Sequence, residues 1–147
     1  MFFVVQAELT IDAPPQRVFD RLADFAAWPS WMPRSFVPIV RAGAASPLRQ
    51  GDSFRVKVGG APFASTLKLR TLERPREITW TGGLRGVLWA EHRFVLEPDG
   101  DHRTRVRSIE TWRGALAGVT ERIVKPLAEK IGIQQLAGLA RASALTR

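Results

Sequence analysis

The sequence predicts an α+β protein in which a curved antiparallel sheet of seven strands surrounds a long C-terminal helix. Three observations support this prediction. Apolar and polar side chains alternate through most of the chain between Ser35 and Trp112, and short turns separate the alternating runs. Helical periodicity follows from Leu116 onward, and two proline-bounded segments after the first strand indicate two short helices. We expect residues 1–147 to form one domain, because this length fits a single hydrophobic core.

The N-terminal part predicts one strand and two short helices. Residues 3–11 alternate apolar and polar side chains, which is typical of a half-buried strand. Residues 14–25 begin with two prolines, which suit a first helical turn, and then carry apolar side chains at helical spacing. Residues 26–33 are interrupted by Pro29 and Pro33, so we expect at most a short helix or a turn there.

Six further strands are predicted in the middle of the chain. They are expected at residues 35–42, 52–58, 62–73, 76–83, 89–97 and 102–112. Pro38 places the first of these at an edge of the sheet, because proline cannot donate to a central strand ladder.

The last two strands form a predicted hairpin around the turn Pro98–Asp101. Gly100 adopts positive φ freely, which suits a tight reversal. A turn centred on Gly100 places His92 opposite Ser108 and leaves Glu110 about one pair further along. Since side chains alternate between the two faces of a strand, His92 and Glu110 both lie on the apolar face.

The C-terminal segment from Leu116 to about Leu145 predicts a helix of ~28 residues, about 42 Å long at 1.5 Å per residue. Its expected buried stripe consists of Val119, Ile123, Leu127, Ile131 and Leu136. Pro126 is expected to kink or divide this helix.

The composition excludes several classes of protein. The chain has no cysteine, which excludes disulfides, thiolate metal sites and cysteine nucleophiles and fits a reducing compartment. Its first 15 residues carry no basic segment and only about five consecutive apolar residues, so they predict neither a signal peptide nor a membrane span. We therefore expect a cytoplasmic location.

No metal ion or cofactor is expected from the motifs. The two histidines, His92 and His102, are ten residues apart and lack partners at the usual ligand spacings. The chain also contains neither a dinucleotide-binding nor a phosphate-binding glycine motif, and no Ser lies in a G-x-S-x-G elbow.

Four segments together resemble a known family. They are residues 11–33 (IDAPPQRVFDRLADFAAWPSWMP), 72–83 (LERPREITWTGG), 92–106 (HRFVLEPDGDHRTRV) and 110–116 (ETWRGAL). In these residues and their order along nearly the whole chain, the protein resembles the START-like superfamily of helix-grip proteins, also called SRPBCC or Bet v 1-like proteins. Within it, the chain is similar to the bacterial polyketide cyclase/dehydrase branch. The resemblance implies a cavity between the sheet and the long helix, with apolar or amphipathic ligands such as lipids, sterols or polyketides.

The first functional hypothesis is that the cavity binds a small hydrophobic ligand, because pockets are mostly apolar with a few orienting polar groups. The residues expected to line it are Trp28, Trp31, Phe54, Val56, Leu67, Leu69, Ile78, Trp80, Leu88, His92, Phe94, Val106, Ser108, Glu110, Trp112, Val119, Ile123 and Leu127. Among them, Trp28 and Trp31 lie on the proline-broken segment, where they could gate the mouth of the cavity.

Two alternatives remain open. His92 and Glu110 could act as an acid–base pair in an enzyme of the cyclase, dehydrase or hydrolase type, or they could pair with each other or with Ser108 for packing alone. The second alternative is an interaction domain that uses the basic convex face of the sheet, since the net charge is +8.

The convex face is expected to carry Arg55, Lys57, Lys68, Arg70, Arg93, Arg103, Arg105 and Arg107, interleaved with Glu8, Glu77, Glu91 and Glu97. Opposite charges on neighbouring strands favour ion pairs. Nucleic-acid binding is not expected, because sheets that bind bases present several exposed aromatic rings and here only Trp89 qualifies. The sequence leaves the oligomeric state open.

Overall fold

The computed structural model describes residues 1–40, 46–59 and 63–144. In chain order the elements are β1 (Phe2–Ile11), α1 (Pro15–Ala23), the 3-10 helix η1 (Phe25–Ser30), β2 (Phe36–Pro38), β3 (Ser53–Val58), β4 (Ser65–Glu73), β5 (Glu77–Leu84), β6 (Leu88–Pro98), β7 (Thr104–Arg113) and α2 (Ala117–Ala144). Parts of the predicted strands at 35–42 and 62–73, namely 41–42 and 62, lie outside the described residues.

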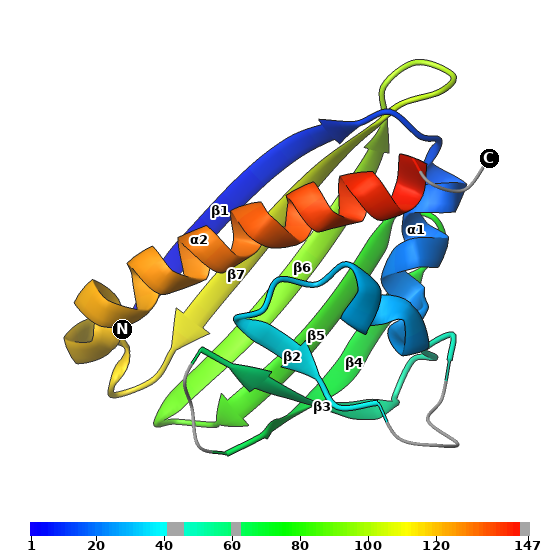
Figure 1. Cartoon of the computed structure of the whole chain (residues 1–147). Helices are drawn as coiled ribbons and strands as arrows, with labels where there is room; N and C mark the ends of the chain where they lie inside the picture. The colour runs from blue at the N-terminus through cyan, green and yellow to red at the C-terminus, as the bar shows by residue number, and fades with distance from the viewer. Residues whose placement is uncertain (41–45, 60–62, 145–147) are drawn as a thin grey trace.

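The strands form one antiparallel sheet in the order β1-β7-β6-β5-β4-β3-β2. The sheet curves around α2, which crosses its concave side, while α1 and η1 lie near the C-terminal end of α2 (Figure 1). The seven-stranded helix-grip fold predicted from the sequence is therefore confirmed. β2 forms one edge of the sheet and β1 the other. The edge position of β2 agrees with Pro38 at its end, because a proline has no N–H to donate to a second neighbouring strand.

The register of the β6–β7 hairpin differs from the sequence prediction by two residues. Pro98 pairs with Thr104, so five residues, 99–103, form the connection. The N–H of Asp99 donates to the carbonyl of Arg103 at 2.9 Å and closes this longer loop. The predicted pairs were therefore wrong, but the predicted faces were right, because a shift of two residues preserves side-chain alternation.

The convex face of the sheet is wet and charged, as the alternation predicted. Arg105 and Arg107 point outward and both contact Glu97, at 3.0 Å and 2.9 Å, whereas Val106 between them is fully buried. Arg93 pairs with Glu77 at 3.0 Å in the same way. These cross-strand ion pairs offset part of the basic charge of the face.

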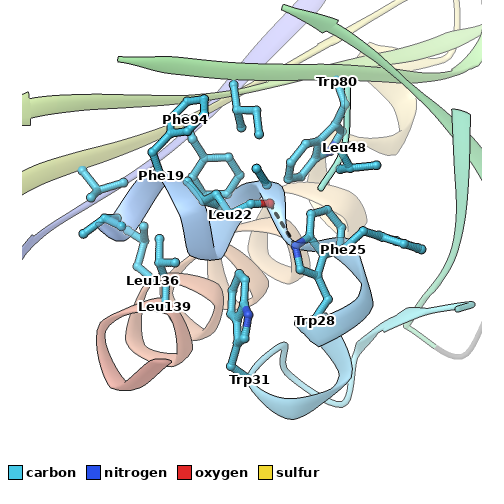
Figure 2. Packing of buried hydrophobic residues seen from close by; sticks show 14 of the residues in the cluster. Phe19, Leu22, Phe25, Trp28, Trp31, Leu48, Trp80, Phe94, Leu136 and Leu139 are labelled. Carbon is cyan, nitrogen blue, oxygen red and sulfur yellow. Dashed lines mark hydrogen bonds between the residues drawn. The ribbon is translucent and has the colours of Figure 1, made fainter. Parts of the chain in front are cut away.

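One end of the concave side is filled by an aromatic core beneath α1 and η1. Trp28 is fully buried there, in edge contact with Phe25 and Phe54 and with its Nε1–H donating to the carbonyl of Leu22 at 3.0 Å (Figure 2). The apolar residues of α1 pack around it, which explains their helical spacing. The prediction that Trp28 gates a cavity mouth is therefore wrong, because its only polar atom is satisfied inside the core.

The buried face of α2 is made largely of small residues. Its buried residues are Ala117, Ala128, Ile131, Gly132, Gln135, Leu136, Gly138, Leu139 and Ser143. Val119 and Ile123 point to solvent, with 74% and 76% of their surface exposed, and Leu127 is 42% exposed, so the predicted buried stripe is wrong for these three residues. The physical reason is that Ala128 and Gly132 let the helix approach the sheet, which turns the larger side chains of its first half away. Pro126 lies inside α2 and does not divide it.

The close approach of α2 to the rest of the protein gives a first prediction. A Cβ at Gly138 would collide with the backbone carbonyl of Trp31, which cannot swing aside, so Gly138→Ala should lower the free energy of unfolding by about 1–3 kcal/mol. A Cβ at Gly132 would meet Ala7 and Ser108 at 3.8 Å, an ordinary contact. Gly132→Ala should therefore be neutral or stabilise by up to ~1 kcal/mol through helix propensity. Urea unfolding measures both, and equal losses would contradict the packing described.

The orientation of α2 gives a second prediction. Ile123→Ala should change the free energy of unfolding by no more than about 0.5 kcal/mol, because its side chain is exposed. Leu136→Ala, on the buried face of the same helix, should cost about 2–5 kcal/mol. Chemical denaturation of the two variants tests the face assignment, which fails if Ile123→Ala is the more damaging substitution.

Candidate functional site

A cavity of about 350 Å³ lies between α2 and the concave face of the sheet. Its walls are formed by Phe36, Val58, Ser65, Leu67, Trp80, Gly82, Gly83, Leu88, His92, Glu110, Trp112, Val124, Leu127, Ala128, Ile131 and Gln135. The lining is mostly apolar, and its few polar side chains come from β4, β6, β7 and α2. This combination is typical of pockets for small organic molecules.

The structure brings only part of the predicted lining together. Seven of the predicted residues line the cavity: Leu67, Trp80, Leu88, His92, Glu110, Trp112 and Leu127. Eight others are packed in the core instead: Trp28, Phe54, Val56, Leu69, Ile78, Phe94, Val106 and Ser108. Trp31 lines a separate surface groove beside α2, and Val119 and Ile123 face solvent. The core residues lie on the predicted face, but neighbouring side chains from α1, η1 and α2 cover them.

Sequence reasoning missed Gln135, the most deeply buried polar side chain of the cavity wall. It is 1% exposed on the helix face that also carries Ile131 and Leu139, four residues before and after it. This spacing was a usable signal, because residues four apart share a helix face. Gly82 and Gly83 were missed as well. Glycines inside a strand indicate a close approach by another group, and here a Cβ at Gly82 would collide with the side chain of Leu67 and one at Gly83 with the backbone carbonyl of Leu88.

His92 is held rigidly by aromatic neighbours and one hydrogen bond. Its imidazole stacks on Phe94 with ring centroids 4.4 Å apart and contacts the edge of Trp80 at 5.1 Å. Nε2 lies 2.7 Å from the hydroxyl oxygen of Ser108. Burial lowers the pKa of His92 to about 3, so the ring is neutral at physiological pH.

Glu110 pairs directly with His92 across β6 and β7, and its Oε2 lies 3.5 Å from His92 Nδ1. Burial raises the pKa of Glu110 to about 7, since an ionised carboxylate loses its hydration there. The nearby indole N–H of Trp112 lowers the pKa in part, although its geometry falls short of a hydrogen bond. Near neutral pH the carboxyl group can therefore both give up and take a proton.

Ser108, His92 and Glu110 follow one another in the order of a nucleophile, a base and an orienting acid. The position of the serine argues against nucleophilic catalysis. Ser108 is 3% exposed and lies beneath α2, where a Cβ at Gly132 would be 3.8 Å from its hydroxyl oxygen. A substrate in the cavity meets His92 and Glu110 but not this hydroxyl. Ser108 therefore fixes the His92 ring.

Several polar atoms near the cavity have no protein partner. Both side-chain polar atoms of Gln135, Oε1 and Nε2, are buried without a hydrogen bond, and so is Nε1 of Trp112. Both residues line the cavity. Buried polar groups normally have a partner, so these atoms stand out as polar groups of the cavity-lining residues that the fold leaves unpaired.

Within residues 1–40, 46–59 and 63–144, no three His, Cys, Asp or Glu side chains come together in a way that would hold a metal ion. Nor does either helix in this part of the chain have the length and apolar character needed to cross a membrane.

Comparison with solved structures gives the fold a context. A hypothetical protein of Helicobacter pylori is 18% identical, covering 96% of this chain and 88% of its own, with a TM-score of 0.76. The aromatase/cyclase ZhuI of a Streptomyces species is 15% identical, covering 98% and 94%, with a TM-score of 0.73. Norcoclaurine synthase of Thalictrum flavum, solved with dopamine and hydroxybenzaldehyde, is 11% identical, covering 100% and 89%, with a TM-score of 0.74.

The sheet, the long helix and the cavity between them thus define a helix-grip protein. The family profile described as "Polyketide cyclase / dehydrase and lipid transport" matches residues 3–144. The chain therefore belongs to this family, and the resemblance stated from the sequence is confirmed. A search of curated proteins gave no match.

The buried carboxyl group gives a third prediction. Because the folded-state pKa of Glu110 is raised, its contribution to stability is present below the unfolded-state pKa and is lost as pH rises through about 7. Glu110→Gln should remove this loss. The variant should gain stability relative to the unsubstituted protein between about pH 5 and pH 8, by roughly 3 kcal/mol if the full shift is expressed.

Urea unfolding at the two pH values measures this gain. Glu129→Gln, which removes a carboxylate from an exposed position of α2, is the control. The lowered pKa of His92 acts in the opposite direction, because its contribution is lost as pH falls below about 6.5. Glu110→Gln and the unsubstituted protein both retain His92, so the contribution of His92 to the difference in their stability cancels to a first approximation. A difference between them that does not change with pH would contradict a buried, titrating Glu110.

Proposed function

We propose that the protein reversibly binds an apolar or amphipathic small molecule in the cavity beneath α2. The observation that carries the proposal is an apolar cavity whose few polar side chains include atoms without protein partners. The family's description as cyclases, dehydrases and lipid-transport proteins supports ligand binding of this kind. His92 and Glu110 are proposed to orient the polar end of the ligand, while Leu67, Leu88 and Ile131 contact its apolar body.

Filling the cavity tests this function and gives a fourth prediction. Val124 is half-buried and lines the cavity from α2, so the ring of Val124→Phe should occupy the ligand's space without disturbing the contact of Ala128 and Gly132 with the sheet. Affinity for ligand should fall on the order of tenfold or more. Ile133→Phe, which adds the same ring on the exposed side of α2, is the matched control and should leave binding unchanged.

Native mass spectrometry of the protein purified from cells identifies co-purified ligands. Quenching of Trp80 and Trp112, which both line the cavity, then reports binding in solution. The proposal fails if Val124→Phe folds normally and binds as well as the unsubstituted protein, because the ligand would then lie elsewhere.

Acid–base catalysis is the second candidate, and one observation favours it. Glu110 faces the cavity with its pKa raised to about 7, close to the optimum for proton transfer at neutral pH. The similar aromatase/cyclase and norcoclaurine synthase make cyclisation and condensation substrates reasonable to assay. Loss of turnover by about a hundredfold in Glu110→Gln at unchanged binding would establish catalysis. Absence of turnover leaves the binding function. An interaction role for the convex face stays a hypothesis.

A further inference from the structure

We infer that Gln135 and Trp112, together with Glu110, select ligands whose buried end is an uncharged hydroxyl group. This inference rests on the proposed function, because it concerns the chemistry of the same cavity. It begins with the atoms that lack a partner: Gln135 Oε1, Gln135 Nε2 and Trp112 Nε1. Gln135 is 1% exposed, so bulk water does not satisfy its amide.

The unpaired atoms include both kinds of hydrogen-bonding group. Nε2 of Gln135 and Nε1 of Trp112 are donors and require an acceptor, whereas Oε1 of Gln135 requires a donor. The carboxyl group of Glu110 adds an acceptor when ionised and a donor when protonated. A ligand group that pairs with both the amide and the indole must therefore both donate and accept hydrogen bonds. A hydroxyl group does so, since it carries one O–H and two lone pairs.

Charged head groups match this set less well. A carboxylate only accepts, so it would leave Gln135 Oε1 unpaired and would face Glu110. Among the described residues of the cavity wall, no Lys or Arg is present to neutralise a carboxylate. An ammonium group only donates, so it would leave the N–H groups of Gln135 and Trp112 unpaired. The net charge of +8 further disfavours a cation.

The position of Gln135 explains how selection would work. It lies on α2, while Glu110 and Trp112 lie on β7, so a bound hydroxyl group would be held from the helix and from the sheet at once. The aromatic contacts of His92 and its hydrogen bond to Ser108 keep the ring beside Glu110 in one orientation. Polar groups fixed before the ligand arrives discriminate strongly between head groups, because a mismatched group leaves them unpaired.

The test uses four probes with the same bicyclic ring and different head groups: naphthylmethanol, naphthylmethylamine, naphthoate and methylnaphthalene. Calorimetric titration should rank the alcohol above the amine and the carboxylate. In Gln135→Leu, which keeps the side-chain volume similar, the affinity for naphthylmethanol should fall about tenfold, the effect of losing a buried hydrogen bond. The affinity for methylnaphthalene should change less than about threefold. Gln134→Leu, the exposed neighbour on α2, should alter neither.

Trp112→Phe provides a second variant if Gln135→Leu does not fold, and the same selective loss for the alcohol is expected. The inference is overturned if the folded variants bind alcohol and hydrocarbon with equal losses, or if the amine or the carboxylate is the tightest ligand. In those cases the cavity still binds ligand and the proposed function stands. If none of the four probes binds, the inference is overturned together with the proposed function.

Discussion

The close contact between the small residues of α2 and the β1–β7 side of the sheet is the constraint on which the rest of the structure depends. Gly132 lies against Ala7 and Ser108, and Ala128 is buried on the same helix face. A helix held this close to one side of a curved sheet cannot follow the other side as closely. The aromatic core below α1 and η1 fills one end of the remaining space, and the cavity occupies the rest.

The cavity combines a rigid polar edge with an apolar wall. His92 and Glu110 are neighbours across two strands, yet burial moves their pKa values in opposite directions, down for the imidazole and up for the carboxyl group. Both shifts favour the uncharged form, so this end of the cavity carries little charge at pH values below about 7. A neutral interior suits apolar and hydrogen-bonding groups, because neither requires a counter-ion. The convex face on the other side of the same strands differs, since its side chains are charged and form ion pairs.

Local patterns in the sequence were sufficient to predict the strands, the helices and the faces of the sheet, because alternation and helical spacing are properties of single segments. They were insufficient where two segments compete for one space. Val119 and Ile123 look like a buried stripe, but Ala128 and Gly132 allow the closer approach and so decide which face of α2 is buried. Trp28 was predicted to gate the cavity, but its ring packs against Phe54 and Trp80, which are distant in the sequence. Its indole N–H donates to the carbonyl of Leu22 inside the core. Gln135 was predictable from its spacing of four residues from Ile131 and from Leu139, but only apolar residues were considered for the buried face of α2.

The length of the β6–β7 connection has an evolutionary consequence. His92 and Glu110 share the concave face because residues 99–103 set their register. An insertion or deletion of one residue that shifts the pairing would turn either His92 or Glu110 outward, whereas a change of two would restore the same facing. A change in the length of the hairpin tip is therefore compatible with the polar edge of the cavity where the extra residues stay in the connection, where a bulge absorbs them, or where they shift the pairing by an even number. The pairing register of a surface hairpin thus limits which insertions a buried site can tolerate.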